Sequence, residues 1–129
     1  MEVVRRCNAA FNRRDRDAAF DDYHPNLEWR DLQHAPDTPE RIEGIAELLA
    51  VWEDWENAFE DFTAEIEECI DAGKFVVTLT HWRAKGKGSA LTVDQRSAEV
   101  WEFANGKIAR ATVGYANLGA ALKAVGRER

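Results

Sequence analysis

The chain has 129 residues, of which 45% are hydrophobic, including five Trp, six Phe and two Tyr. This length and this apolar content predict one folded domain over residues 1–129 and argue against a disordered chain. Aspartate and glutamate number 24 against 17 lysine and arginine residues, which gives a formal net charge of −7. Because nucleic-acid binding depends on a net-positive face, the charge disfavours a nucleic-acid partner.

Two further classes are disfavoured by the apolar pattern and by the cysteines. No apolar run reaches the roughly 18 residues of a membrane helix, and the first 15 residues lack the apolar core of a signal peptide. We therefore expect a cytoplasmic protein without a membrane partner. Cys7 and Cys69 form no CxxC motif, and the three histidines are scattered. The sequence thus predicts reduced thiols and neither a metal site nor a cofactor.

The N-terminal 31 residues predict two helices followed by a short strand. Apolar residues recur at helical spacing from Val3 to Phe11. Asp15 can cap a second short helix, and Pro25 lies beyond the end of that helix. LEWRD, residues 27–31, then alternates as a strand that ends on an aspartate.

A long amphipathic helix is predicted next. Apolar residues recur at helical spacing from Ile42 to Phe59, and acids occupy the opposite face. The start of this helix stays open between two signals. Thr38-Pro39 is a good cap and first turn, whereas Gly44 could equally mark the entry.

Residues after about 60 predict long antiparallel strands joined by turns. The first strand has apolar residues that alternate with polar ones: Phe62, Ala64, Ile66 and Ile70. Turns are predicted at Ala72-Gly73, in a loop near Gly88-Ser89 and at Asn105-Gly106, where both residues tolerate the positive φ of a type I′ hairpin. A last strand over 107–115 precedes a short C-terminal helix. Helices segregated from an antiparallel sheet indicate an α+β fold.

RSAEVWEF, residues 96–103, reads as a strand with an acid among its apolar residues. Strand alternation places Ser97, Glu99, Trp101 and Phe103 on one face. If this face lines a pocket, desolvation raises the pKa of Glu99 and keeps its carboxyl neutral, able to donate a hydrogen bond. If the face is reversed or wet at its end, Glu99 is an ordinary surface acid. Both alternatives stay open because a one-residue register error exchanges the two faces.

Three segments in this order resemble the nuclear transport factor 2-like superfamily, and within it the SnoaL-like group. They are FNRRDRDAAFDDYHPNLEWRD, GIAELLAVW and VWEFANGKIARATVGYANLGAALKAVG. The resemblance implies a cone-shaped α+β fold in which a strongly bent antiparallel sheet wraps around the N-terminal helices, and a homodimer formed through the sheet. The fold carries isomerases of ketosteroids, polyketide cyclases, dehydratases and epoxide-opening enzymes, and also members with no chemistry.

The resemblance to ketosteroid isomerase implies roles for individual residues. Asp31 ends the short strand, where those enzymes carry the general base, and Glu99 stands where they carry a protonated acid of the oxyanion hole. The tyrosine that completes the hole is replaced by Cys7, and a thiol is a weak donor. An aspartate that ends a strand is also often only a turn residue, so Asp31 keeps both interpretations.

Other side chains are candidates for assistance or for ligand contact. His81 and Arg83 share one face of their strand, so His81 could shuttle a proton or could be a structural residue of the sheet. Trp82 is predicted to point away from the cavity, toward a subunit contact. The candidate substrate-binding residues are Arg83 and the aromatic residues Tyr23, Trp29, Trp52, Trp101 and Tyr115; the aromatic residues could instead belong to the core.

The sequence therefore leaves three functional hypotheses. The first is a cofactor-independent isomerase, cyclase or dehydratase for a small, mostly apolar organic ligand, with Asp31 as base, Glu99 as neutral donor, and His81 and Tyr115 assisting. The second is a non-catalytic ligand-binding or dimeric accessory domain of the same fold. The third is an interaction module that uses the sheet face.

Overall fold

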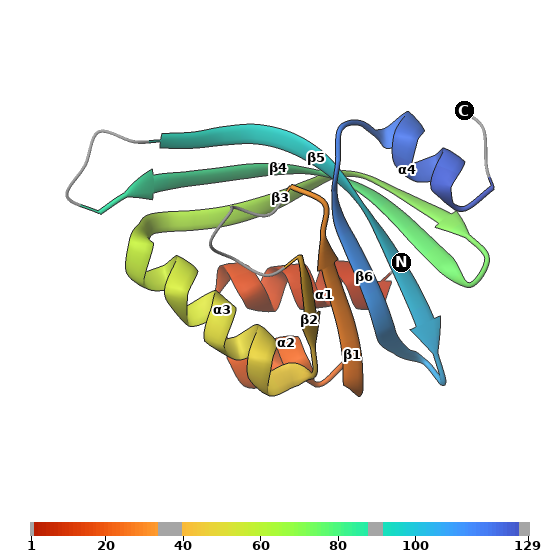
Figure 1. Cartoon of the computed structure of the whole chain (residues 1–129), viewed down its shortest axis with the longest axis horizontal. Helices are drawn as coiled ribbons and strands as arrows, with labels where there is room; N and C mark the ends of the chain where they lie inside the picture. The colour runs from red at the N-terminus through yellow and green to blue at the C-terminus, as the bar shows by residue number, and fades with distance from the viewer. Residues whose placement is uncertain (1, 34–39, 88–91, 127–129) are drawn as a thin grey trace.

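The computed structural model describes residues 2–33, 40–87 and 92–126 (Figure 1). Its elements are, in chain order, α1 (Glu2–Asn12), α2 (Arg16–Phe20), β1 (Tyr23–Asp31), β2 (Arg41–Glu43), α3 (Ile45–Ala58), β3 (Phe59–Ala72), β4 (Phe75–Gly86), β5 (Thr92–Ala104), β6 (Lys107–Tyr115) and α4 (Leu118–Ala124). The loop predicted near Gly88-Ser89 and the possible helix start at Thr38-Pro39 lie outside the described residues. None of the helices in the described ranges is long and apolar enough to cross a membrane.

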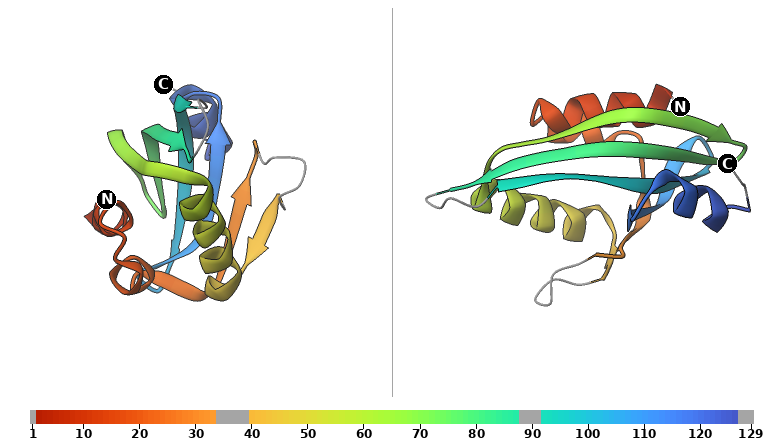
Figure 2. Two further views of the ribbon diagram at one scale, coloured as in Figure 1. Left: turned by 90° about the vertical axis from the view of Figure 1, so that its left-hand side faces the viewer. Right: turned by 90° about the horizontal axis from the view of Figure 1, so that it is seen from above.

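The described strands form one six-stranded sheet in the order β2-β1-β6-β5-β4-β3. The long strands bend so that the sheet curves around α1, α2 and α3, while α4 packs against the opposite face (Figures 1 and 2). The expected α+β fold with a strongly bent sheet around the helices is confirmed, and the sheet is open. One detail differs from an all-antiparallel sheet, because β1 runs parallel to β6 and only the other four pairings are antiparallel.

Local signals explain where the helices begin. The side chain of Asp15 caps α2 by accepting a hydrogen bond from the Ala18 N–H at 3.1 Å, as predicted. Gly44, with φ of +86°, is the N-cap of α3, so the later of the two expected starts is correct. The helix is shorter than predicted at both ends, because Ile42 lies in β2 and Phe59 begins β3.

Each face of the sheet carries its own apolar cluster. On the concave face, which we call the inner face, α1, α2 and α3 cover a cluster that includes Leu27, Trp29, Leu48 and Ile108. On the outer face, α4 covers a smaller cluster built around Val77. The inner cluster is therefore the main core, and the candidate site lies within it.

A bulge in β3 exchanges the faces along that strand. The pairing with β4 shifts between Ile66 and Glu68, so that Ile66 lies opposite Thr80 but Ile70 lies opposite Val77. Ile70 consequently packs in the outer cluster. The predicted alternation, which placed Ile66 and Ile70 on one face, is wrong beyond the bulge because one extra residue reverses the pattern.

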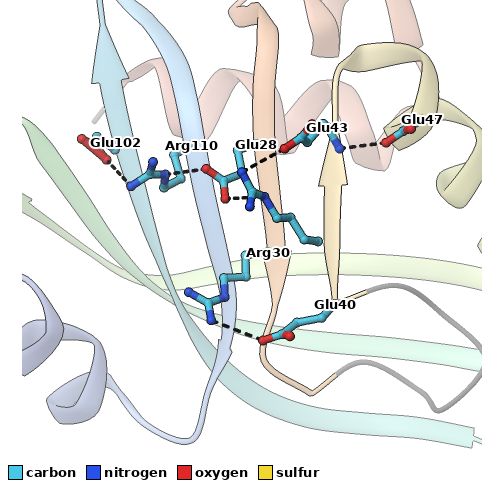
Figure 3. A network of polar contacts seen from close by, with 8 residues as sticks. Glu28, Arg30, Glu40, Glu43, Glu47, Glu102 and Arg110 are labelled. Atoms are coloured by element: carbon cyan, nitrogen blue, oxygen red, sulfur yellow. Dashed lines mark hydrogen bonds and ion pairs between the residues drawn. The ribbon is translucent and has the colours of Figure 1, made fainter.

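A ladder of alternating charges crosses β5, β6, β1 and β2 (Figure 3). Glu28 in β1 lies between Arg110 of β6 at 3.0 Å and Arg41 of β2 at 2.8 Å. Arg110 also approaches Glu102 of β5 at 3.7 Å, and Arg41 approaches Glu43 at 2.9 Å. Opposite charges on neighbouring strands favour this register, although each exposed pair contributes little.

Candidate functional site

Glu99 is buried on the inner face of β5 and is only 1% exposed. Trp101 and Phe103 of the same strand pack on the inner cluster, whereas Ala98 and Val100 belong to the outer cluster. The predicted face assignment for residues 96–103 is therefore confirmed, and Glu99 is not a surface acid.

Three hydroxyl groups of the described residues hold the carboxyl of Glu99. Thr78 donates a hydrogen bond to Oε1 at 2.7 Å, and Thr80 donates a second one to the same oxygen. Ser97 approaches Oε2 at 3.2 Å. Thr78 lies directly opposite Glu99 in the antiparallel register, and Thr80 lies opposite Ser97. The strand pairing itself thus assembles this cluster of Glu99, Thr78, Thr80 and Ser97.

Two indole N–H groups donate hydrogen bonds to two of these hydroxyl groups. Trp101 donates its Nε1–H to Thr78 Oγ1 at 2.9 Å, and Trp82 donates its Nε1–H to Ser97 Oγ at 3.0 Å. Since each hydroxyl has a single proton, an indole that occupies an acceptor site of the oxygen leaves that proton free for Glu99. The indoles therefore orient Thr78 and Ser97 as donors toward the acid.

The surroundings of Glu99 favour the neutral acid. Burial raises the pKa of Glu99 to about 7, and hydrogen bonds from Thr80, Thr78, Ser97 and Trp82 limit this rise. No cationic side chain lines its cavity within the described ranges. Near neutral pH, the carboxyl is therefore poised between a hydrogen-bond donor and a carboxylate.

Glu99 borders a small inner cavity of about 30 Å³. The described residues that line this cavity are mainly apolar and aromatic: Val4, Cys7, Asn8, Phe11, Tyr23, Trp29, Trp52, Trp55, Ile66, Thr80, Trp82, Glu99 and Trp101. The indole N–H groups of Trp29 and Trp52 are buried and have no hydrogen-bond partner. A space of this size suits a water molecule rather than an organic ligand, and the free N–H groups favour an acceptor there.

A second, larger cavity of about 400 Å³ adjoins the inner one. We call it the outer cavity; it lies on the same concave face of the sheet and not on the outer face that α4 covers. It shares Trp29, Trp55 and Trp82 with the inner cavity, and its remaining described lining residues come from β1, β3, β5 and β6 and the segment after β1: Asp31, Gln33, Phe59, Phe62, Val93, Gln95, Ser97, Val113 and Gly114. The volume and the aromatic wall suit a small organic molecule.

Asp31 ends β1 and lines the outer cavity. Its Oδ1 accepts a hydrogen bond from the Gln33 N–H at 2.9 Å, so it also makes the turn that an aspartate at a strand end often makes. Gly114 passes close by with φ of +91°, and a Cβ at that position would come within 3.2 Å of Asp31 Oδ1. The absence of a side chain at Gly114 therefore gives Asp31 its place at the cavity.

Residues 4–111 match the family of SnoaL-like domains. The chain belongs to this family. A comparison with curated protein sequences finds no match.

Three solved structures share the fold of this SnoaL-like domain. A nuclear transport factor 2-like protein of unknown function from Burkholderia pseudomallei is 21% identical, with a TM-score of 0.78 and coverage of 89% of this chain and 88% of that one. TerC, co-crystallized with polyporic acid, is 18% identical, with a TM-score of 0.78 and 88% of each chain covered. A protein with a ketosteroid isomerase-like fold from Catenulispora acidiphila, in complex with trimethylamine, is 17% identical, with a TM-score of 0.76 and coverage of 98% and 93%.

Cys7 lines the inner cavity of the SnoaL-like domain but is engaged elsewhere. Its thiol donates to Asp22 Oδ2 at 3.8 Å, and Asp22 in turn holds Arg6 at 2.7 Å. Burial and the neighbouring Asp22 raise the pKa of the Cys7 thiol to about 12. The thiol therefore stays protonated, and its proton is directed at Asp22 instead of into the cavity.

The predicted aromatic residues divide between the two faces. Tyr23, Trp29, Trp52 and Trp101 all line the inner cavity. Tyr115, in contrast, packs with the outer cluster beside α4 and lines a separate surface pocket. The expectation that Glu99 and Tyr115 share a pocket is wrong, because the pairing of β5 with β6 shifts between Ala98 and Val100.

His81 and Arg83 also lie away from both cavities. The His81 ring is buried on the outer face, where Nε2 is bonded to Asp94 and Nδ1 is 3.0 Å from Arg83 Nη2. The prediction that His81 and Arg83 share one face of their strand is confirmed, but this face is that of Val77 in the outer cluster and not the one that carries Glu99. The structure thus does not bring His81 or Arg83 to either candidate acid.

The alternation of side chains along β4 also places Trp82, Thr78 and Thr80 on the face that carries the cavities. Trp82 was predicted to point away from the cavity, yet it lines both cavities. Thr78 and Thr80 share its face and were not identified from the sequence. A signal was present, since Thr78 and Thr80 interrupt an apolar strand at a spacing of two, and buried hydroxyls need partners.

The described part of the SnoaL-like domain contains no group of three or more His, Cys, Asp or Glu side chains that could hold a metal ion. The titratable groups that line the two cavities in this part are Cys7, Tyr23, Asp31 and Glu99. Burial raises the pKa of Tyr23, so its phenol stays protonated. The arrangement therefore offers one buried acid in the inner cavity and one carboxyl at the outer cavity.

Proposed function

We propose that this SnoaL-like domain binds a small, mostly apolar organic molecule in the outer cavity and catalyses acid/base chemistry on it without a cofactor. The observation that carries the proposal is the pairing of a buried acid, Glu99, with an adjoining aromatic cavity that holds a second carboxyl, Asp31. Two acids in unlike environments can divide the roles of donor and base. The ligands named for TerC and for the Catenulispora protein support a small-molecule site in this fold.

The reaction class is isomerisation, cyclisation or dehydration next to a carbonyl group. In each of these reactions, a base removes a proton from the carbon beside the carbonyl, and a donor stabilises the oxygen that becomes negative. Asp31 is the base in this proposal, and neutral Glu99 acts on the oxygen. His81 and Tyr115 take no part, since both lie on the outer face.

The test is a proton-exchange experiment that does not need the natural substrate. The protein is incubated in D2O with aromatic ketones that fit about 400 Å³, and deuterium at the carbon beside the carbonyl is followed by mass spectrometry. We expect exchange above the buffer rate in the wild type and a loss of roughly 10²- to 10⁴-fold in Asp31→Asn. Equal exchange in wild type and Asp31→Asn would remove Asp31 from the mechanism.

The competing function is a non-catalytic ligand-binding domain. It is favoured by Cys7, whose thiol stands in the place of the expected tyrosine and is turned toward Asp22. A ketone that binds, as judged by quenching of tryptophan fluorescence, but shows no enzyme-dependent exchange would favour this function. An interaction module remains the third hypothesis, and it predicts that neither binding nor exchange occurs.

We also propose that the domain forms a homodimer through the outer sheet face. This proposal is supported by the resemblance to nuclear transport factor 2-like proteins and by Leu79, a half-buried apolar side chain on this face beside the part that α4 covers. Sedimentation equilibrium should give twice the chain mass of 14.6 kDa, and Leu79→Arg should give the monomer mass. A monomeric wild type at micromolar concentration would refute the dimer but leave the ligand site untouched.

A further inference from the structure

Ser97 is the hydroxyl of the Glu99 cluster that reaches the outer cavity. Thr80 lines the inner cavity, and Thr78 lines neither cavity, whereas Ser97 lines the outer one. Ser97 is also the group that approaches Oε2 of Glu99, while both threonines donate to Oε1. Ser97 is therefore the hydroxyl that links Glu99 to the space beside Asp31, and Trp82, which also bonds to Glu99 and lines both cavities, donates to this hydroxyl.

The two carboxyl oxygens of Glu99 have different hydrogen-bond roles. Oε1 receives two hydrogen bonds, so it acts as the acceptor oxygen in both charge states. The proton of the neutral acid then belongs on Oε2, which faces Ser97. Ser97 Oγ already accepts from Trp82 Nε1, which leaves it one further acceptor site for the acid proton.

The direction of the Ser97 hydroxyl therefore follows the charge of Glu99. When Glu99 is a carboxylate, the Ser97 proton is used on Oε2. When Glu99 is neutral, Oε2–H donates to Ser97 Oγ, and the Ser97 proton becomes free to point into the outer cavity. Trp82 keeps the oxygen of Ser97 in place in both states.

We propose that Ser97 relays the hydrogen-bond state of Glu99 to the outer cavity, and that it selects aromatic ligands that present an accepting oxygen, such as a ketone or quinone carbonyl, to this wall. The inference rests on the proposed ligand site and adds the residue that contacts the ligand oxygen. It also explains how Glu99 can act although the inner cavity, at about 30 Å³, has no room for the ligand itself.

The relay completes a balanced proton path for the proposed chemistry. Asp31 takes the proton from the carbon beside the carbonyl and becomes neutral. Ser97 gives its proton to the carbonyl oxygen as the enol forms, and it receives the proton of Glu99 Oε2. Glu99 ends as a carboxylate, so one negative charge moves from Asp31 to Glu99 and no oxidant or second substrate is required.

Few other titratable groups face this path. Cys7 from α1 and Tyr23 from β1 line the inner cavity, and burial raises the pKa of both groups, so they stay protonated near neutral pH. Among the described residues that line the outer cavity, Asp31 is the ionisable one. A change in ligand affinity between pH 5.5 and 8.5 that persists in Asp31→Asn therefore reports Glu99.

The experiment compares two probes of nearly equal shape, 2-acetylnaphthalene, which has a carbonyl oxygen, and 2-ethylnaphthalene, which has none. Dissociation constants are measured by tryptophan fluorescence at pH 5.5 and 8.5 for the wild type, Ser97→Ala, Ser97→Thr, Glu99→Gln and Asp31→Asn. We expect the wild type to bind the ketone roughly 3- to 10-fold more tightly at pH 5.5 than at pH 8.5. This change in affinity corresponds to one neutral hydrogen bond. The hydrocarbon should show no such change.

The variants separate the relay from a direct contact with Glu99. Ser97→Ala should bind both probes without dependence on pH, whereas Ser97→Thr, which keeps the hydroxyl, should restore the dependence. Circular dichroism confirms that each variant is folded. A pH dependence that survives in Ser97→Ala but disappears in Glu99→Gln would overturn the relay, since the ligand would then contact Glu99 itself.

The remaining outcomes distinguish the relay from the function on which it rests. Binding of both probes without any dependence on pH in the wild type would overturn the relay and leave the ligand site standing. Failure of both probes to bind would overturn the proposed site and the relay together.

Discussion

Glu99 and Glu28 are glutamates on two strands of one sheet, and the protein stabilises them in opposite ways. Glu28 is flanked by Arg110 at 3.0 Å and Arg41 at 2.8 Å, and its side chain is 20% exposed. Glu99 is 1% exposed, and its hydrogen-bond partners among the described residues are the uncharged side chains of Thr78, Thr80, Ser97 and Trp82. The first arrangement surrounds a glutamate with cationic partners, and the second favours a neutral acid.

The two glutamates differ in whether the groups around them carry a charge. Guanidinium groups near water compensate Glu28 at low cost, but a cation beside Glu99 would favour the ionised form of that acid. Hydroxyl groups satisfy the oxygens of Glu99 in either charge state. Because they carry no charge, they leave the pKa of Glu99 at about 7, where a proton can be gained or lost.

The largest expected effect is the pH dependence of stability that Glu99 produces. Below its ordinary pKa of 4.5, Glu99 is neutral in the folded and unfolded chains alike. Between 4.5 and about 7, the unfolded chain ionises while the folded protein keeps the proton, so the free energy of unfolding falls as pH rises. At about 1.4 kcal/mol per pH unit, the total loss by pH 8 is about 3 kcal/mol.

The measurement is urea unfolding of the wild type and Glu99→Gln from pH 4 to 8. The amide cannot ionise, so the stability of Glu99→Gln relative to the wild type should rise by about 3 kcal/mol across this range. Glu28→Gln, measured in the same way, is the matched control for replacing a glutamate of this sheet by its amide. A constant difference between Glu99→Gln and the wild type would mean that Glu99 is ionised in the folded protein.

The next effect tests the close backbone approach at Asp31. Gly114→Ala adds a Cβ that would lie 3.1 Å from the Gln33 nitrogen and 3.2 Å from Asp31 Oδ1, at a φ of +91°. We expect a loss of about 2 kcal/mol, since both the positive φ and the contact are unfavourable. Gly106→Ala is the control, because Gly106 has φ of +79° but nothing within 4 Å of the added Cβ.

The two alanine variants together isolate the contact from the backbone strain. Gly106→Ala should lose about 1 kcal/mol, the cost of the left-handed backbone alone. Urea unfolding measures both values. Equal losses in the two variants would show that the wall beside Asp31 yields easily and that Gly114 does not position this residue.

The fold was predictable because its signals are local and repeated. The cap at Asp15, the Asn105-Gly106 turn and the alternation over residues 96–103 each depend on neighbours in the chain, and each prediction is confirmed. The long helix was predicted too long because its apolar spacing continues into strands at both ends. The spacing of apolar residues does not by itself show that β2 ends before Gly44 and that α3 begins after it.

The site was harder to predict because it depends on pairing between distant strands. Glu99 was assigned to the correct face, but Thr78 became its partner through the register of β4 with β5. The prediction for Trp82 is wrong because neighbouring residues of β4 face opposite sides, so a side chain next to the outward-facing His81 lies at the cavities. One shift in the pairing of β5 with β6 likewise carried Tyr115 to the outer face.

The smallest expected effect concerns the charge ladder. Glu28→Gln removes the carboxylate from Arg110 and Arg41, but both arginine side chains are more than half exposed. Water solvates them after the change, so the loss of stability should stay below about 1 kcal/mol. It should shrink further in 0.5 M NaCl, where salt screens exposed charges. Urea unfolding at low and high salt measures this loss. A loss above about 2 kcal/mol that persists in salt would show that the ladder, and not only the hydrogen bonds of the sheet, fixes the pairing of β1 with β6.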